Sequence, residues 1–393
     1  MSYSAEVADR SGQRAGAGRH GSGERLRLAV DAVGGDLGSQ PTIEAALALA
    51  DRYRMILVGP RARLEKELAD RGCLGEVEIR DAAESVGMGE HPIAATTRKR
   101  DSSLIVAAGL VAAGGADAMI TAGNTGAAVL AAAVRMRRLP GVLNPALATL
   151  LPVPGATETV LLDIGATTAC PPSWLAQFAT LGSAYARARL GLVAPRIGLL
   201  SNGSEPIKGG PPQRGAHALL GAQPGYLGHV EAYDLLSDRV DVVVCDGFTG
   251  DVALKMYERT LDLTAEVALA AGGKLLGVPT GQTLREAVTR ALRATLAAEP
   301  GGVLLGVGGV CVVCHGAANA NDLIRAGEIA AACVRADVPG RMGAAVRALR
   351  PADAPAQPPS AATGMVASAA TDAAAAAYPF SSAAATDASS RGV

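Results

Sequence analysis

Short runs of apolar residues alternate along the chain with longer Ala-rich stretches whose apolar positions recur at helical spacing. Runs that are apolar throughout are typical of strands buried on both faces, so the alternation predicts a parallel sheet covered by helices on both faces. The expected strands are Leu26–Val30, Met55–Val58, Ala118–Thr121, Leu147–Leu151, Val160–Asp163, Ile197–Leu200, Val240–Cys245 and Val310–Cys314. The expected helices are Pro41–Ala50, Ala62–Asp70, Ser102–Ala113, Ala127–Arg138, Pro172–Leu190 and Val252–Leu269.

Six of these strands end in the same way, with a polar residue followed at once or within a few positions by glycine. Ligands of open parallel sheets bind at the carboxyl ends of the strands, where glycine permits close approach and helix N-termini offer N–H groups to an anion. We therefore expect the six ends to converge on an anion site. The alternative is a set of ordinary βα turns, in which Gly, Asn and Asp are frequent. No loop carries a Walker A motif or a complete G-x-G-x-x-G after a strand, so a nucleotide is not expected.

Composition narrows the class of protein further. The 393 residues carry a net charge of -1 with 3% aromatic residues, which argues against a nucleic-acid binder that needs basic patches and stacking rings. Residues 1–24 and 351–393 are rich in small and polar residues and are expected to be disordered, which leaves 25–350 as the folded part. We expect no signal peptide and no membrane span.

The segment Cys311–His315 fits C-x-x-C-H, the attachment pattern of c-type haem. It lies in a Val-rich run that is typical of a buried strand, and no second Cys/His pair stands at zinc-ligand spacing. Both cysteines are therefore interpreted as small core residues, and neither a metal nor a cofactor is expected.

A set of motifs, in order, resembles the PlsX-type phosphate acyltransferases over about Leu26 to Cys333. The motifs are Asp31–Asp36, Gly89–Pro92 through Arg98–Ser103, Ala122–Gly126, Pro145–Thr149, Leu161–Gly165, Gln177–Phe178 with Gly182–Ser183, and Cys245–Gly250. The resemblance implies a three-layer α/β/α fold with a largely parallel sheet, related to phosphate acetyltransferases and isopropylmalate dehydrogenase-like folds. It also implies a homodimer that transfers an acyl group from acyl carrier protein to inorganic phosphate in the cytoplasm, at the inner face of the membrane.

This chain departs from the family pattern at several positions. The family's N-I-G-E-E-x-x-K-G is here Ser201–Gly209, which keeps the lysine but has Ser201 and Ser204 in place of the asparagine and the first glutamate. Ala169 and Asn319 each stand where the family has an acidic residue. Each change removes a charge or a hydrogen-bonding group, which bears on rate and substrate range.

Three residues are the candidates for the chemistry. Lys208 would hold phosphate and the developing negative charge, although a solvated loop lysine is the common alternative. Asp246 would position Lys208 or a water or assist proton transfer, unless it only closes a turn. His315 would donate to the thioester carbonyl or steady the leaving sulfur, or else it is a satisfied core histidine. Attack of phosphate on a thioester requires mainly alignment and oxyanion stabilisation, because the thiol leaves readily.

Glycine-rich loops supply the remaining candidates for binding phosphate and the acyl thioester. For the segment Asn124–Gly126 the alternative is a plain helix cap, to which Thr125 is also suited. The substrate-binding candidates are Asn124, Thr125, Gly126, Ser201, Asn202, Gly203 and Gly247.

A helical hairpin is expected over 252–298, and its second helix has apolar residues on one side and arginines on the other. Such a helix suits a membrane surface or the acidic carrier protein, whereas a helix packed on the core or at a dimer interface is the commoner case. The contact residues expected are Leu284, Val288, Leu292, Arg285, Arg290 and Arg293.

Two other functions compete with acyl transfer from carrier protein. One is a phosphate acetyl- or butyryltransferase that uses short acyl-coenzyme A. The other is a non-catalytic membrane-associated scaffold, which the substitutions at Ala169, Ser201, Ser204 and Asn319 favour.

Overall fold

The computed structural model describes residues 25–276, 288, 292 and 295–348. The predicted tails, 1–24 and 351–393, and the contact residues Leu284, Arg285, Arg290 and Arg293 lie outside the described residues. Val288 and Leu292 are both helical and partly buried, and residues 295–296 are helical as well.

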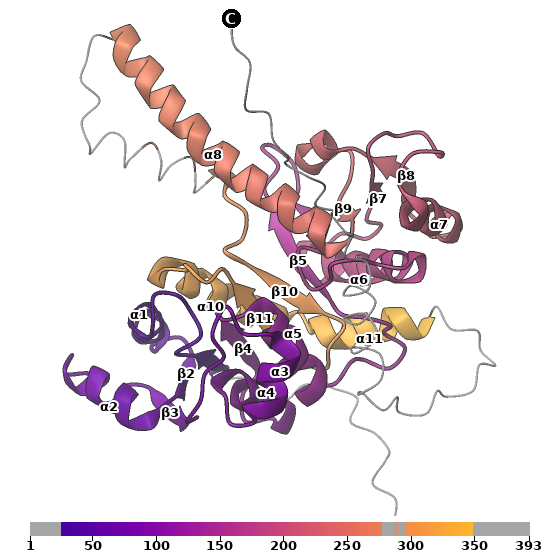
Figure 1. Cartoon of the computed structure of the whole chain (residues 1–393). Helices are drawn as coiled ribbons and strands as arrows, with labels where there is room; N and C mark the ends of the chain where they lie inside the picture. Colours follow the sequence, from indigo (N-terminus) through magenta and orange to yellow (C-terminus); the bar gives the residue numbers. More distant parts are fainter. Residues whose placement is uncertain (1–24, 277–287, 289–291, 293–294, 349–393) are drawn as a thin grey trace, which may run out of the picture. The chain divides into compact units, whose positions relative to one another are not determined.

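The described residues build one sheet of 11 strands in the order β3-β2-β1-β4-β11-β10-β5-β6-β9-β7-β8 (Figure 1). The strands are β1 (Arg27–Asp31), β2 (Arg54–Gly59), β3 (Glu78–Asp81), β4 (Ala118–Thr121), β5 (Ala146–Leu151), β6 (Thr159–Leu162), β7 (Ile197–Leu200), β8 (Tyr226–Val230), β9 (Val242–Val244), β10 (Gly301–Leu305) and β11 (Val310–Cys314). Strands in the middle of the sheet are buried along their whole length, in keeping with sequences that contain no charged residue.

Helices cover both faces of the sheet and complete three layers, which confirms the predicted fold class. The helices are α1 (Gln40–Leu49), α2 (Arg61–Ala69), α3 (Pro92–Arg98), α4 (Ser103–Ala113), α5 (Thr125–Arg135), α6 (Pro172–Leu190), α7 (Pro211–Leu220), the 3-10 helix η1 (Ala232–Leu236), α8 (Gly247–Leu276), α10 (Ala320–Arg335) and α11 (Val338–Ala348). One face carries α1, α2, α6, α7, α10 and α11, and the other carries α3, α4, α5 and α8.

The prediction that six strand ends converge on one edge of the sheet is wrong. Strands β1 to β4 and β11 run parallel, but β10 is antiparallel to β11, β5 is antiparallel to β10, and β6 is antiparallel to β5. Strands β6, β9, β7 and β8 then continue parallel to one another. The carboxyl ends of the two parallel halves therefore lie at opposite edges, and the strand ends form two groups.

Three strands were not expected from the sequence, namely β3, β8 and β10. Strand β10 begins with two glycines, and the edge strands β3 and β8 carry polar or small residues, so none reads as a plain apolar run. Two expected helices begin more than one residue earlier than predicted. Helix α5 starts at Thr125 and α8 at Gly247, because Asn124 and Asp246 accept hydrogen bonds from their first turns.

Candidate active site

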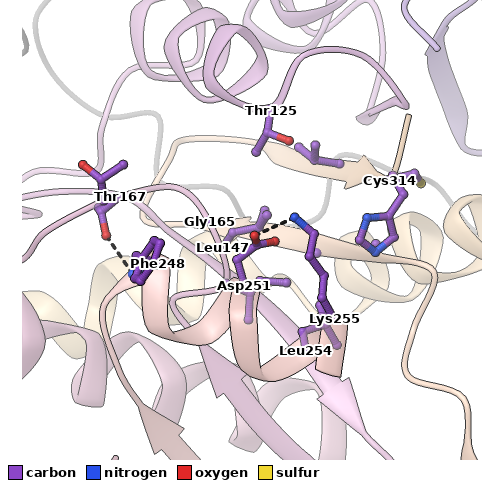
Figure 2. A pocket seen from close by; sticks show the side chains of 16 residues that line it. Thr125, Leu147, Gly165, Thr167, Phe248, Asp251, Leu254, Lys255 and Cys314 are labelled. Atoms are coloured by element: carbon purple, nitrogen blue, oxygen red, sulfur yellow. Dashed lines mark hydrogen bonds and ion pairs between the residues drawn. The ribbon is translucent and has the colours of Figure 1, made fainter. Parts of the chain in front are cut away.

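A pocket of about 280 Å³ lies over the seam between the two parallel halves, and we call it the central pocket. Its floor comes from β5, β10 and β11, and its sides come from the first turn of α5, the first half of α8 and the loop after β6 (Figure 2). Among the predicted site residues, Thr125, Gly247 and His315 line this pocket. The two edges of the sheet therefore both contribute to it: Thr125 and His315 come from one edge and Gly247 from the other.

The hollow in the floor depends on two glycines at the start of β10. A Cβ at Gly302 would stand 2.4 Å from Cγ of Leu147, and one at Gly301 would stand 2.5 Å from the carbonyl oxygen of Val313. Real side chains never approach so closely, so only glycine allows β10 to pack here and leave the pocket open above it. Neither glycine was recognised as part of the site from the sequence.

Asn124 acts as the N-cap of α5 and as a clamp on the preceding loop. Its Oδ1 accepts from the N–H of Ala127 at 3.0 Å, and its Nδ2 donates to the carbonyl oxygens of Met88 and Glu90 at 3.0 and 3.1 Å. The side chain is 7% exposed, and these bonds occupy its amide. Asn124 thereby fixes the start of α5, whose next residue, Thr125, faces the pocket.

Gly126 allows α3 and α5 to meet. A Cβ at this position would stand 2.6 Å from Cγ of Pro92, the first residue of α3. The glycine thus serves the packing of the two helices, and the pocket receives from this segment Thr125 and the positive end of the α5 dipole.

The opposite wall is organised around Asp163, which is fully buried after β6. Its Oδ1 accepts from the N–H groups of Leu147, Gly165 and Ala166 at 2.9 to 3.2 Å. Its Oδ2 accepts from the N–H and hydroxyl of Thr167 at 2.8 and 2.7 Å. Burial raises the pKa of Asp163, and these five donors act against that rise.

The motif Asp246–Gly250 packs the start of α8 against this wall. A Cβ at Gly250 would stand 1.9 Å from the carbonyl oxygen of Asp163, and one at Gly247 would stand 2.2 Å from that of Thr167. The carboxylate of Asp246 accepts from the N–H and the hydroxyl of Thr249 at 2.9 and 2.8 Å, which caps α8. The glycines of this motif therefore allow close packing of α8, and its aspartate caps the helix.

Lys208 lies in the loop after β7, and the residues Ser201, Asn202, Gly203 and Lys208 are outside the lining of the central pocket. The loop closes on itself, because Oδ1 of Asn202 accepts from the N–H of Gly209 at 2.9 Å. A hydrogen bond to β8 also holds the loop, because Nδ1 of the buried His229 lies 3.0 Å from the carbonyl oxygen of Glu205. The role of Lys208 in holding phosphate stays a prediction.

Two charged pairs involve α8 beside the central pocket: Asp251 with Lys255, which both line it, and Glu258 with His315. Of these four residues, only His315 was expected from the sequence. Nζ of Lys255 lies 2.6 Å from Oδ2 of Asp251, and Nε2 of His315 lies 3.3 Å from Oε1 of Glu258 (Figure 2 draws the first pair). The hydrogen bond that His315 donates to Glu258 raises the pKa of His315, while partial burial acts to lower it. The spacing of Asp251, Lys255 and Glu258, i, i+4 and i+7 on one helix face, was the available signal.

One cysteine, the buried Cys314 at the end of β11, lines the pocket. Burial raises the pKa of its thiol to about 12, and the same holds for Cys311. Cys314 is therefore a neutral thiol at physiological pH and a poor nucleophile. Transfer through a cysteine acyl-enzyme is disfavoured on this ground.

The positions that depart from the family pattern lie in different surroundings. Asn319 caps α10: its Oδ1 accepts from the N–H groups of Asn321 and Asp322 at 2.9 and 3.2 Å. Ala169 and Ser204 are exposed, and Ser201 lies beside the loop of Lys208. None of the four lines the central pocket.

The model of the family described as "Fatty acid synthesis protein" matches residues 26–341. A phosphate acyltransferase of Syntrophotalea carbinolica is 40% identical over 309 residues, covering 77% of this chain and 89% of the relative. A second phosphate acyltransferase, from Desulforudis audaxviator, is 41% identical over 333 residues, covering 83% of this chain and 97% of the relative.

Solved structures agree on the fold. A phosphotransacetylase from Streptococcus pyogenes superposes with a TM-score of 0.55 at 15% identity, covering 80% of this chain and 95% of that one. Another, from Staphylococcus aureus, gives a TM-score of 0.51 at 14% identity over 79% of this chain and 94% of its own. At this identity the likeness concerns the fold alone.

The three-layer fold and these relatives define an acyltransferase enzyme. More particularly, the chain belongs to the fatty acid synthesis protein family, the PlsX family of phosphate acyltransferases. The resemblance found in the sequence motifs is thereby confirmed. Among the described residues, no helix is long and apolar enough to cross a membrane.

Proposed function

We propose that the enzyme transfers a fatty acyl group from acyl-acyl carrier protein to inorganic phosphate and releases an acyl phosphate for phospholipid synthesis. The names of the relatives support acyl transfer to phosphate, and the family description supports a fatty acyl substrate. The carrier protein as donor and the acyl phosphate as product are the parts that this proposal adds.

The observation that carries the proposal is the set of groups around the central pocket. The start of α5 with Thr125, the ammonium of Lys255 and the imidazole of His315 all border one hollow of about 280 Å³. Helix N-termini and cations bind phosphate, and they also stabilise the oxyanion that forms when phosphate attacks a thioester. A hollow of this size suits phosphate and the thioester rather than a whole acyl chain.

The reaction balances with one proton carrier. An oxygen of hydrogen phosphate attacks the thioester carbon, an O–C bond forms, and the C–S bond then breaks. Protonated His315 gives its proton to the departing sulfur, and the hydroxyl proton of the attacking phosphate restores it. The net proton movement is from phosphate to thiol, so a single histidine serves both steps.

Release of free thiol from palmitoyl-acyl carrier protein tests the proposal. We expect release that requires phosphate and that falls about 100-fold in Lys255→Met, the loss typical of one removed electrostatic donor. The matched control is Lys66→Met, because Lys66 forms a similar pair with Asp70 at 2.7 Å on α2, away from the pocket. Release from acetyl- or butyryl-coenzyme A alone would instead assign a short-chain transferase, and no release from any donor would leave a scaffold.

The same assay on Lys208→Ala examines the loop after β7. A rise in the KM for phosphate would support a role for Lys208 in binding this substrate, and unchanged kinetics would remove that role. His229→Leu, which breaks the hydrogen bond to Glu205 at 3.0 Å, separates loss of the lysine from displacement of the loop.

We further propose that the enzyme is a homodimer. Four apolar side chains follow one face of α8 and are 46 to 61% exposed: Val252, Met256, Leu263 and Val267. An exposed apolar row on a helix favours contact with another apolar surface, and α8 of a second copy of the chain offers such a surface. Sedimentation of Met256→Glu should give a monomer, and an unchanged mass would exclude this face as the interface.

Peripheral contact with the cytoplasmic membrane is proposed from the sequence of the second hairpin helix. Three apolar residues recur there at helical spacing together with three arginines, namely Leu284, Val288 and Leu292 with Arg285, Arg290 and Arg293. Flotation with anionic vesicles is the test. Leu284→Glu combined with Leu292→Glu should abolish flotation, and unchanged flotation would remove the assignment.

A further inference from the structure

The pair formed by Glu258 and His315 joins two parts of the chain that are 57 residues apart. Glu258 lies on α8, about three turns after the helix start, and His315 follows directly after β11. Nε2 of His315 and Oε1 of Glu258 are 3.3 Å apart. Because Glu258 occupies Nε2, the second ring nitrogen, Nδ1, is the one left for exchange with a substrate.

Other charged groups surround the imidazole. Lys255 and Asp251 lie on the same face of α8 and bond to each other at 2.6 Å. From the loop after β1, the N–H of Asp36 donates to the carbonyl oxygen of Gly316 at 2.8 Å, so Asp36 adjoins the residue after His315. Only Glu258 contacts the imidazole through a hydrogen bond or ion pair among these neighbours.

We propose that Glu258 is a positioning residue for acyl transfer, which holds His315 through Nε2 so that Nδ1 exchanges the proton with the substrates. The inference rests on the proposed function, since it assigns the proton carrier of that reaction. Glu258 itself touches no substrate. Its work is to orient the ring and to favour the imidazolium, the form that gives its proton to the leaving sulfur.

The sign of the pH dependence follows from this arrangement. Glu258 raises the pKa of His315, so the cation is present below the raised pKa and is lost as the pH rises through it. The ion pair contributes stability over the same range. Removing the charge at position 258 lowers the pKa of His315, and the alkaline limb of kcat then moves to lower pH.

The test compares Glu258→Gln with Glu266→Gln, a neighbour on α8 that pairs with Arg259 at 3.5 Å. We expect Glu258→Gln to shift the alkaline limb of kcat to lower pH, to reduce kcat at the alkaline end about tenfold, and to leave the KM for phosphate unchanged. Glu266→Gln should match the wild type. In a His315→Asn background, Glu258→Gln should cost nothing further, because the two residues act as one unit.

An NMR titration of the histidine rings gives a readout that is independent of activity. The chain has five histidines, and His315→Asn identifies the signal of interest. A lower measured pKa of His315 in Glu258→Gln, together with the shifted limb, supports the inference. An unchanged pKa or an unmoved limb overturns it. A lowered pKa in a protein whose wild type releases no thiol would instead show that the acyl-transfer reaction, and with it the role of Glu258, is wrong while the pairing is right.

Discussion

The two walls of the central pocket are built on different principles. Around Asp163, five donors converge on one buried carboxylate, and glycines at 247 and 250 bring α8 against it. Around His315, the charged side chains are half-exposed: His315 and Glu258 are 44% and 38% exposed, and Lys255 is 60% exposed. The first wall is saturated with hydrogen bonds, whereas the second has single, exchangeable pairs.

This difference indicates how the work is divided. A saturated, buried carboxylate has no capacity left for a substrate, and its loss leaves several donors without partners. Half-exposed pairs contribute little to stability but exchange protons and contacts readily. Substitutions at the Asp163 wall should therefore damage folding, and those at the His315 wall should damage catalysis.

The largest effect is expected for Asp163→Ala. It leaves the N–H groups of Leu147, Gly165, Ala166 and Thr167 without their acceptor inside the protein, at a cost of about 3–5 kcal/mol in the free energy of unfolding. Urea denaturation measures this loss. Asp163→Asn, which keeps one carbonyl oxygen, should lose less. A stability equal to that of the wild type in Asp163→Ala would show that the wall does not depend on this carboxylate.

The second prediction concerns the other wall. His315→Asn should lower kcat at least 100-fold, because the proton carrier of the proposed reaction is removed. Its urea midpoint should stay near that of the wild type, since the side chain is 44% exposed and its pair with Glu258 is a weak one. Steady-state thiol release and denaturation of the same preparation give both numbers. Equal losses of stability in His315→Asn and Asp163→Ala would erase the contrast between the walls.

The sequence predicted the layers and most of the strands, because buried strands and Ala-rich helices leave strong local patterns. The six strand ends were wrongly expected on one edge because β10 was not predicted as a strand. Strands β10 and β5 separate two parallel halves that run in opposite directions, and Gly301 and Gly302 interrupt the apolar pattern of β10. The motif resemblance identified the family, but it could not show whether a motif residue caps a helix or binds a substrate. Asn124 and Asp246 were both proposed as site residues, and both cap helices.

There is a physical reason why the sequence did not predict the pairing of Glu258 with His315. Glu258 meets His315 only because the first three turns of α8, which begins after β9, reach the end of β11 and bring together positions 57 residues apart. Charge spacing along α8 marked Asp251, Lys255 and Glu258 as one face. The sequence alone does not indicate whether such a face meets solvent, another helix or a pocket.

The smallest effect is expected for Asn319→Ala, at the start of α10, four residues after His315. Loss of the cap, whose Oδ1 accepts from Asn321 and Asp322, should cost about 1 kcal/mol in the free energy of unfolding. Asn319→Ser, which restores a capping oxygen, should recover most of it, as urea denaturation of the two variants would measure. Activity should be retained in both, because Asn319 lies outside the pocket lining. A large loss of kcat with a preserved cap in Asn319→Ser would mean that this asparagine reaches the substrate, and that the catalytic wall extends beyond His315 into the first turn of α10.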